Sequence, residues 1–152
     1  MKERALRGLA ASAGVAVGRV RLLDSLEPDD TPHRGGKAEA AAAVAALDAE
    51  SDELGDQAER LRADGFAAES DILAANRLMA LDPLLRREVE QLTETLTAGA
   101  ALRAAADRHA ALLAALPDPL LASRATDVRE LGRRAARKLA SDAAPEPDDG
   151  TP

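Results

Sequence analysis

Residues 44–61 read VAALDAESDELGDQAERL, and this stretch decides the fold class. Its apolar and small residues recur at alternating steps of three and four: Val44, Leu47, Ser51, Leu54, Ala58 and Leu61. Such spacing places them on one face of an α-helix, so we predict a helix from about Lys37 to Ala63 with one narrow apolar seam. Asp64-Gly65 predicts the end of this helix, because glycine commonly follows the last helical turn.

The same periodicity predicts four further helices toward the C-terminus. One covers about Ala67 to Leu81, and the next runs to about Leu96 with Asp82 as its N-cap and Pro83 at its first position. Thr97 and Gly99 open a fourth helix, and the last follows the Pro117-Asp118-Pro119 break and runs to about Leu139. The residues that we expect to face inward in these two helices are Leu102, Ala106, His109, Leu113 and Leu116, then Leu121, Val128, Leu131, Ala135 and Leu139.

The N-terminal part has a different pattern. Glycine recurs in LRGLAASAGVAVGRVRLL, residues 6–23, together with valines that are typical of a short strand. We therefore predict a mainly α protein, an antiparallel bundle of about four to five helices over residues 37–140. A short Gly-rich strand segment (1–23) and a polar linker (24–36) precede it, and a disordered tail (141–152) follows.

Composition narrows the function classes. The 152 residues suffice for one modest core, and their charge of −7 with a single aromatic residue, Phe66, argues against nucleic-acid binding. Cysteine is absent, which excludes disulfides and thiolate metal sites. We find no signal peptide and no run of about 18 apolar residues that could span a bilayer, and we therefore expect a cytoplasmic protein without membrane contact.

Residues suited to catalysis are few. His33 lies in the linker and His109 on an apolar helix face, and neither has a second histidine at metal-ligand spacing. We interpret His33 as a solvated loop residue, His109 as a core or boundary histidine, and Gly35-Gly36 as a source of linker flexibility. No catalytic, cofactor or metal residue is predicted, and we expect no catalysis from this chain alone.

Two segments suggest a binding role instead. Around the break at Asp82-Pro83, Leu78, Met79, Leu81, Leu84 and Leu85 supply more apolar surface than one seam can bury. Methionine suits adaptable contact surfaces, so this elbow could receive a partner, although core corners would look the same. In the second segment, residues 124–134, Asp127 can pair with Arg124 or Arg134, and Gly132 permits close helix contact; the pattern alone favours a salt-bridged helix face.

Three motifs in order resemble a known family. Residues 8–18, GLAASAGVAVG, are similar to the opening G-x-x-A-S-P-G-x-A-x-G of bacterial Enzyme I, the phosphoenolpyruvate–protein phosphotransferase of the sugar phosphotransferase system. Residues 72–85 resemble its helix-break motif, and residues 124–134 resemble its R-A-x-D-x-R-D-x-G-x-R signature. The resemblance implies a helical subdomain that binds the small phosphocarrier protein HPr, inserted into an α/β phosphohistidine subdomain to which the opening strand belongs.

The resemblance also implies a docking site and a division of labour. Its partner-binding residues would be Leu78, Met79, Asp82, Leu84, Leu85 and Arg124. The phosphoacceptor motif G-G-x-x-S-H is absent from this chain, and so is the barrel that would bind phosphoenolpyruvate and Mg²⁺. We therefore expect no cofactor in this chain.

This sequence departs from the family at several docking positions. Asn76 stands where histidine is frequent, Pro83 and Leu84 replace a more acidic pair, and Ala67 and Ala68 occupy positions that are commonly acidic. These departures imply that charge contributes less to docking here.

Two alternatives stay open for the function. One is a partial Enzyme I module of a dihydroxyacetone kinase subunit, and the other is a structural bundle that self-associates as a homodimer through the seam at Val44–Leu61.

Overall fold

The computed structural model describes residues 32–143, and side chains as far as Leu139. Over this range the chain forms five helices and no strand. They are α1 (Gly36–Ala63), α2 (Ala67–Ala80), α3 (Pro83–Leu92), α4 (Ala98–Ala114) and α5 (Pro119–Ala143). The prediction of a mainly α, antiparallel bundle is confirmed, whereas the predicted Gly-rich strand lies outside the described residues.

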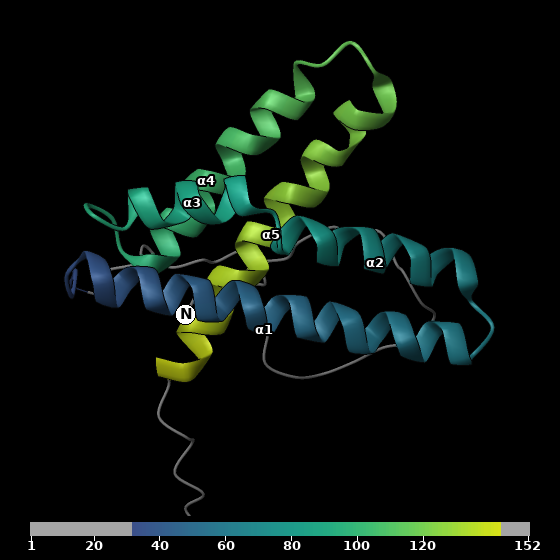
Figure 1. The fold of residues 1–152 in the computed structure, drawn as a ribbon, viewed down its shortest axis with the longest axis horizontal. Helices are drawn as coiled ribbons and strands as arrows, with labels where there is room; N and C mark the ends of the chain where they lie inside the picture. The colour runs from purple at the N-terminus through teal and green to yellow at the C-terminus, as the bar shows by residue number, and fades with distance from the viewer. Residues whose placement is uncertain (1–31, 144–152) are drawn as a thin grey trace, which may run out of the picture.

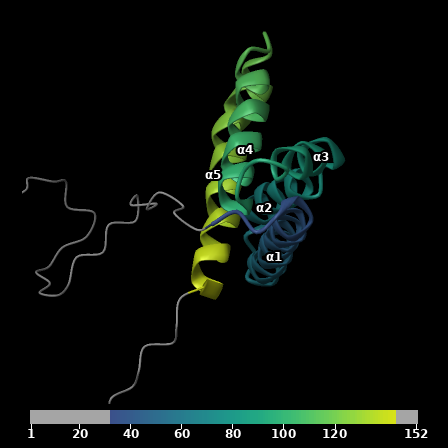
Figure 2. The ribbon, with the colours of Figure 1, turned by 90° about the vertical axis from the view of Figure 1, so that its left-hand side faces the viewer.

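Two antiparallel hairpins make up the bundle. Helices α1 and α2 form one hairpin and α4 and α5 the other, and each pair is packed along much of its length (Figure 1). Turned by 90°, the molecule shows α1, α2 and α3 gathered on one side of the upright α4–α5 pair (Figure 2). The end of the α4–α5 hairpin projects beyond the other helices (Figure 1).

Leucines of the predicted seam supply the centre of the core. Leu47 and Leu54 of α1 are each 1% exposed and pack with Val89 of α3, Leu102 of α4 and Leu131 of α5. Alanines fill most of the remaining core, and their small side chains let the helix backbones approach closely. The approach is tightest at Gly132, where an added Cβ would overlap the Cβ of Ala106 and lie 3.0 Å from the carbonyl oxygen of Leu102.

The helix ends follow from local residues. Gly65, at φ +88°, closes α1: Phe66 N donates to Leu61 O (2.8 Å) and Gly65 N to Arg62 O (3.2 Å), the two bonds of a Schellman motif. Asp82 caps α3 as predicted, since its carboxylate accepts from Leu84 N at 2.8 Å with Pro83 in the first helical turn.

One helix end and two buried residues expected from the sequence are wrong. Helix α3 ends at Leu92 rather than Leu96, because Thr93 bonds the carbonyl of Glu90 through its hydroxyl (2.7 Å) and the chain tightens into a turn. Leu116 and Leu121, expected to face inward, are 41% and 44% exposed. Both lie at the projecting end of the α4–α5 hairpin, where no other helix covers them (Figure 1).

A charged cluster joins α1 to the C-terminal half of α5. Glu50 is 1% exposed, with Arg134 Nε 2.7 Å from its Oε1 and Lys138 Nζ 3.4 Å from its Oε2, and Lys138 also bonds Glu53. Burial raises the pKa of Glu50 above its ordinary value, and the two cations oppose this shift. Glu50 Oε1 accepts no hydrogen bond from a described residue, so its contact with Arg134 is an ion pair.

Candidate functional site

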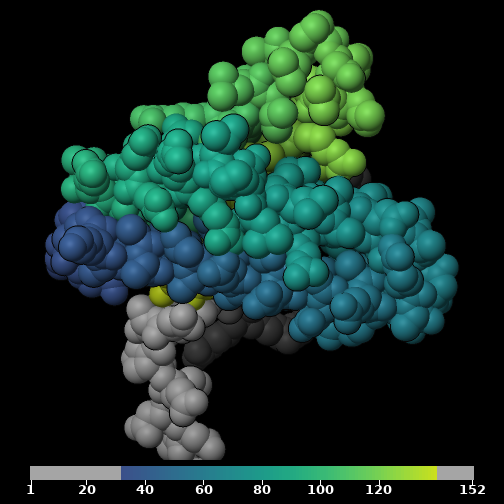
Figure 3. All heavy atoms as spheres, in the orientation of Figure 1, coloured from purple at the N-terminus to yellow at the C-terminus, as the bar shows by residue number. Residues whose placement is uncertain are grey.

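An exposed apolar surface lies at the junction of α2 and α3. Leu78 is 69% exposed, Leu84 65% and Leu81 42%, and these three residues form what we call the elbow surface. Single exposed leucines are ordinary on soluble proteins, but three around one helix break leave an apolar patch that water solvates poorly. Figure 3 shows the face of the molecule on which α2 meets α3, below the projecting end of α4 and α5.

The backbone beneath the elbow surface is held from several sides. Asp82 N donates to Met79 O (3.2 Å), and Arg86 N donates to Asp82 O (3.1 Å), so each helix end is bonded into the turn. The Arg86 side chain adds a tie between helices: Nε donates to Ala80 O (3.0 Å) and Nη2 to Asp48 Oδ1 of α1 (2.6 Å). A backbone held in this way is preorganised, so binding a partner would require little further ordering of the main chain.

The other proposed partner-binding residues have different surroundings. Met79 is partly buried and contacts both core clusters, and Leu85 is 4% exposed and belongs to the core. Asp82 is engaged as the N-cap of α3. The structure thus brings Leu78, Asp82 and Leu84 to the surface and places Leu85 beneath them as support.

Arg124 lies on α5, at the edge of the second core cluster. The neighbouring Ala125 packs in that cluster with Ala110, and Met79 packs against it from α2. Arg124 itself is partly exposed and bonds Asp127 through Nη1 at 3.1 Å, one of the two pairings expected from the sequence. Its guanidinium is therefore oriented by Asp127, and the packing of Met79 brings α2 against this part of α5.

A second set of exposed leucines was not predicted from the sequence. Asp82-Pro83-Leu84-Leu85 recurs as residues 118–121, Asp-Pro-Leu-Leu, and the second copy also begins a helix, with Asp118 Oδ1 accepting from Leu120 N at 2.8 Å. Leu120 is 68% exposed, as is Leu112 on the facing end of α4. The repeat was the signal that could have found Leu120: in both copies the second residue after the capping aspartate is an exposed leucine.

Comparison with known proteins identifies the family. A model of the N-terminal domain of PEP-utilising enzymes matches residues 7–124. The chain belongs to this family. A solved structure titled the N-terminal domain of Enzyme 1 - Nitrogen is similar, with a TM-score of 0.67 and 25% identity over 82% of this chain. The match spans only 55% of that structure's chain, and no curated protein sequence matched this chain. The predicted resemblance to Enzyme I is thus confirmed.

One departure from the Enzyme I pattern has a clear structural setting. Asn76, at a position where the family often has histidine, lies on α2 with its Oδ1 buried, and that oxygen accepts no hydrogen bond from the residues that the structure describes. The next residue, Arg77, spreads its guanidinium over Gly55 of α1, where an added Cβ would lie 3.2 Å from it. Nothing in the structure explains the choice of asparagine here.

The two histidines of the described residues of this PEP-utilising enzyme domain lie apart, His33 before α1 and His109 on α4. His109, half-buried as expected for a boundary histidine, places Nε2 2.8 Å from Glu88 Oε2, and Arg108 lies 3.1 Å from the other oxygen. In residues 32–143, no group of three histidine or acidic side chains is placed to hold a metal ion. None of the described helices combines the length and apolar character needed to cross a membrane.

Proposed function

We propose that this domain docks a phosphocarrier protein of the HPr type through the elbow surface. The observation that carries the proposal is the exposure of Leu78 and Leu84, at 69% and 65%, on either side of a turn whose backbone is already held in place. The chain spans only 55% of its Enzyme I-like relative. We therefore also propose, rather than observe, that a complete protein containing this domain transfers a phosphoryl group to the carrier.

Apolar contact, rather than charge, would supply most of the affinity. Asp82 is partly buried and caps α3, and Arg124 is paired with Asp127, so neither offers a fully free charge to a partner. Burying one leucine contributes about 1.5–3 kcal/mol, and a few such residues at the centre of an interface dominate its energy. The overall charge of −7 would still favour encounter with a basic carrier.

The role follows from the family's division of labour. Residues 1–23 would belong to an α/β subdomain and residues 37–140 would hold the carrier, so that a histidine elsewhere could react with it. Such holding converts an encounter between two proteins into a reaction between neighbours.

Self-association through the seam at Val44–Leu61 receives little support. Leu47 and Leu54, at the centre of that seam, are each 1% exposed and are covered by the other helices of the same chain. A homodimer would need a different surface.

Calorimetric titration with the HPr protein of the same organism tests the proposal. We expect a dissociation constant on the order of micromolar, as is typical of transient complexes. Leu78→Asp should weaken binding about 30-fold or more, which corresponds to roughly 2 kcal/mol, and Leu78→Ala should weaken it less. The matched control is Ala45→Asp, which adds the same charge at an exposed position of α1.

The possible results separate docking at the elbow surface from a general effect of charge and from no binding. Binding that is lost with Leu78→Asp and kept with Ala45→Asp supports docking at the elbow surface. Equal weakening by both variants would mean that added negative charge, and not the elbow, decides binding. Failure to bind at roughly millimolar protein would overturn the proposed function.

A further inference from the structure

A buried carboxylate lies far along the chain from the elbow, at the start of α1. Glu39 is 1% exposed, although glutamate is rarely buried without partners. Its Oε2 accepts a hydrogen bond from Ala98 N, at the N-terminus of α4, at 2.7 Å. Its Oε1 accepts from the backbone N of Arg34 (2.9 Å) and from Arg34 Nε (3.1 Å). One side chain therefore joins the end of the linker to another helix, 59 residues away in sequence.

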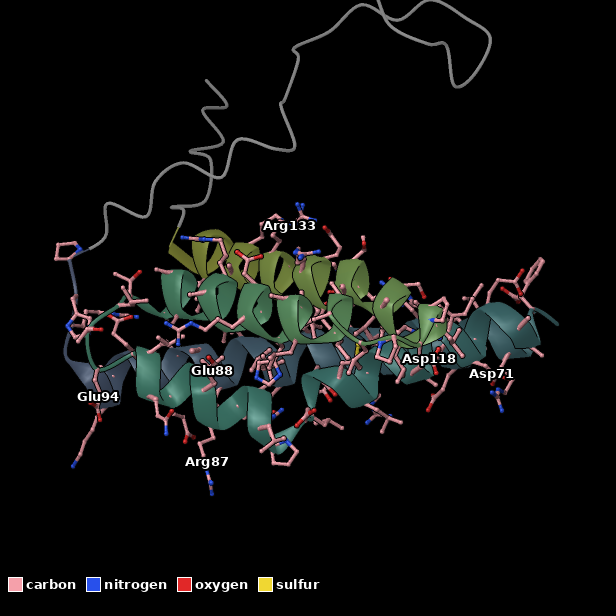
Figure 4. The ribbon with its side chains drawn as sticks, turned by 90° about the horizontal axis from the view of Figure 1, so that it is seen from above. Asp71, Arg87, Glu88, Glu94, Asp118 and Arg133 are labelled. Carbon is pink, nitrogen blue, oxygen red and sulfur yellow. The ribbon has the colours of Figure 1, made fainter. Side chains whose placement is uncertain are left out.

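A second set of contacts holds the same linker end to the turn between α3 and α4. His33 Nε2 lies 2.8 Å from Thr93 O, and Nδ1 accepts from Gly35 N at 3.3 Å, so both ring nitrogens have a hydrogen-bond partner. At Gly36 an added Cβ would lie 3.3 Å from the Cα of Glu94, which leaves no room for a side chain without a shift. Figure 4 shows Glu94 at one end of the bundle, with Asp71 and Asp118 toward the other.

These contacts bear on two expectations from the sequence. His33 is an exposed loop residue, as expected, and its ring also bonds the α3–α4 turn. Gly35-Gly36 was interpreted as a source of flexibility, yet Gly35 adopts φ +102°, a conformation that glycine adopts without strain, and Gly36 packs against Glu94. The glycines here permit a defined turn and a close approach.

The electrostatics of Glu39 favour a persistent contact. The hydrogen bond from the Arg34 side chain, with smaller contributions from the backbone groups of Arg34 and Ala98, lowers the pKa of Glu39 from its ordinary 4.5 to about 2, against the opposing effect of burial. The carboxylate is therefore charged at neutral pH, and it lies at the N-terminus of α4, where a helix attracts negative charge.

We propose that Glu39 acts as a latch that sets the direction in which the chain enters the helical bundle. By bonding Arg34 on one side and α4 on the other, Glu39 holds residues 32–35 against the bundle. The elbow surface and residues 32–35 would then keep a defined relative orientation. Glu39 is thus a positioning residue, remote from any partner. The benefit of orienting the chain relative to the elbow surface depends on the proposed function. The contacts of Glu39 and His33 that hold residues 32–35 in place do not depend on it.

Distance measurement between two spin labels tests the latch. The chain contains no cysteine, so Pro32→Cys and Ala111→Cys, both at exposed positions, would carry the labels without interference. We expect a narrow distance distribution in the parent chain and one at least about twice as wide with Glu39→Gln, because a neutral amide accepts more weakly from Arg34. Amide exchange at Arg34 should accelerate about tenfold or more. Glu59→Gln is the matched control, since it makes the same change at an exposed position of α1.

A second variant guards against general unfolding. Arg34→Ala removes the guanidinium but leaves the hydrogen bond that Ala98 N donates to Glu39, and it should widen the distribution while circular dichroism stays helical. An unchanged width and exchange rate in a folded Glu39→Gln variant would overturn the latch, and so would loss of the helical fold in both variants. Neither latch variant should change HPr affinity by more than about twofold, so failure of the latch and failure of docking are separately visible.

Discussion

The crossing of α4 and α5 at Gly132 makes the substitution Gly132→Ala the sharpest test of the packing. An added methyl group would overlap the Cβ of Ala106 and stand 3.0 Å from Leu102 O. Carbon atoms in contact lie about 3.5–4.0 Å apart, so the two helices would have to separate by about 1 Å. These helices share the most extensive contact in the bundle, and both contribute to the core.

The magnitude follows from two opposing terms. Overpacking costs about 1–3 kcal/mol, and this case belongs at the upper end because backbone as well as side chain must move. Alanine gains about 1 kcal/mol over glycine inside a helix. We therefore expect Gly132→Ala to lower the free energy of unfolding by about 2 kcal/mol, and the melting temperature by roughly 10 °C for a domain of this size.

Urea denaturation followed by circular dichroism measures this loss. Gly55→Ala provides the matched control, because its nearest neighbour is the movable guanidinium of Arg77 at 3.2 Å, and it should be neutral or stabilising. Adding Ala106→Gly to Gly132→Ala should restore part of the loss. A Gly132→Ala variant as stable as the parent chain would refute the close crossing of α4 and α5.

Three further predictions concern caps and charges. Asp82→Ala should cost about 1 kcal/mol in urea denaturation, because Leu84 N loses its cap; Asp82→Ser should keep most of the parent stability, and equal stability of the parent chain and both variants would contradict the cap. The pKa of Glu39 is lowered from 4.5 to about 2 in the folded chain, so Glu39 adds up to about 3 kcal/mol to the free energy of unfolding above pH 4.5, and this is lost as the pH falls toward 2. Urea denaturation of the parent chain and of Glu39→Gln across this range measures the loss. Parallel dependence of the two free energies on pH would contradict it. Arg134→Met should destabilise the chain by about 3 kcal/mol at pH 7, because it removes a partner of buried Glu50. The raised pKa of Glu50 means that this loss should shrink as the pH falls and the carboxyl binds a proton, and a loss independent of pH would show that Glu50 is not its cause.

The helices were predictable because their signals are local. Periodicity located α1 almost to the residue, and Asp64-Gly65 and Asp82-Pro83 marked helix ends through turn chemistry that needs no distant partner. The end of α3 was missed, since the Thr93 hydroxyl competes with the helix there. Periodicity also assigned Leu116 and Leu121 to the interior, because it reports which face of a helix is apolar and not whether another helix covers it.

The candidate site was only partly predictable for the same reason. The exposed leucines at 78 and 84 follow from excess apolar residues at a helix break, but the ties of Arg86 to Ala80 and Asp48 depend on helices brought together by the fold. The contact between Glu39 and Ala98 spans 59 residues and has no sequence signature of its own. Side chains that act across helices become visible only when the helices are placed.

The most direct test of docking is a map of amide chemical shifts in the ¹⁵N-labelled chain as unlabelled HPr is added. We expect the largest changes on residues 76–86, with smaller ones near Arg124, while residues 36–50 of α1 stay unchanged. Changes confined to α1 or to residues 32–39, or none at roughly millimolar HPr, would contradict docking at the elbow surface.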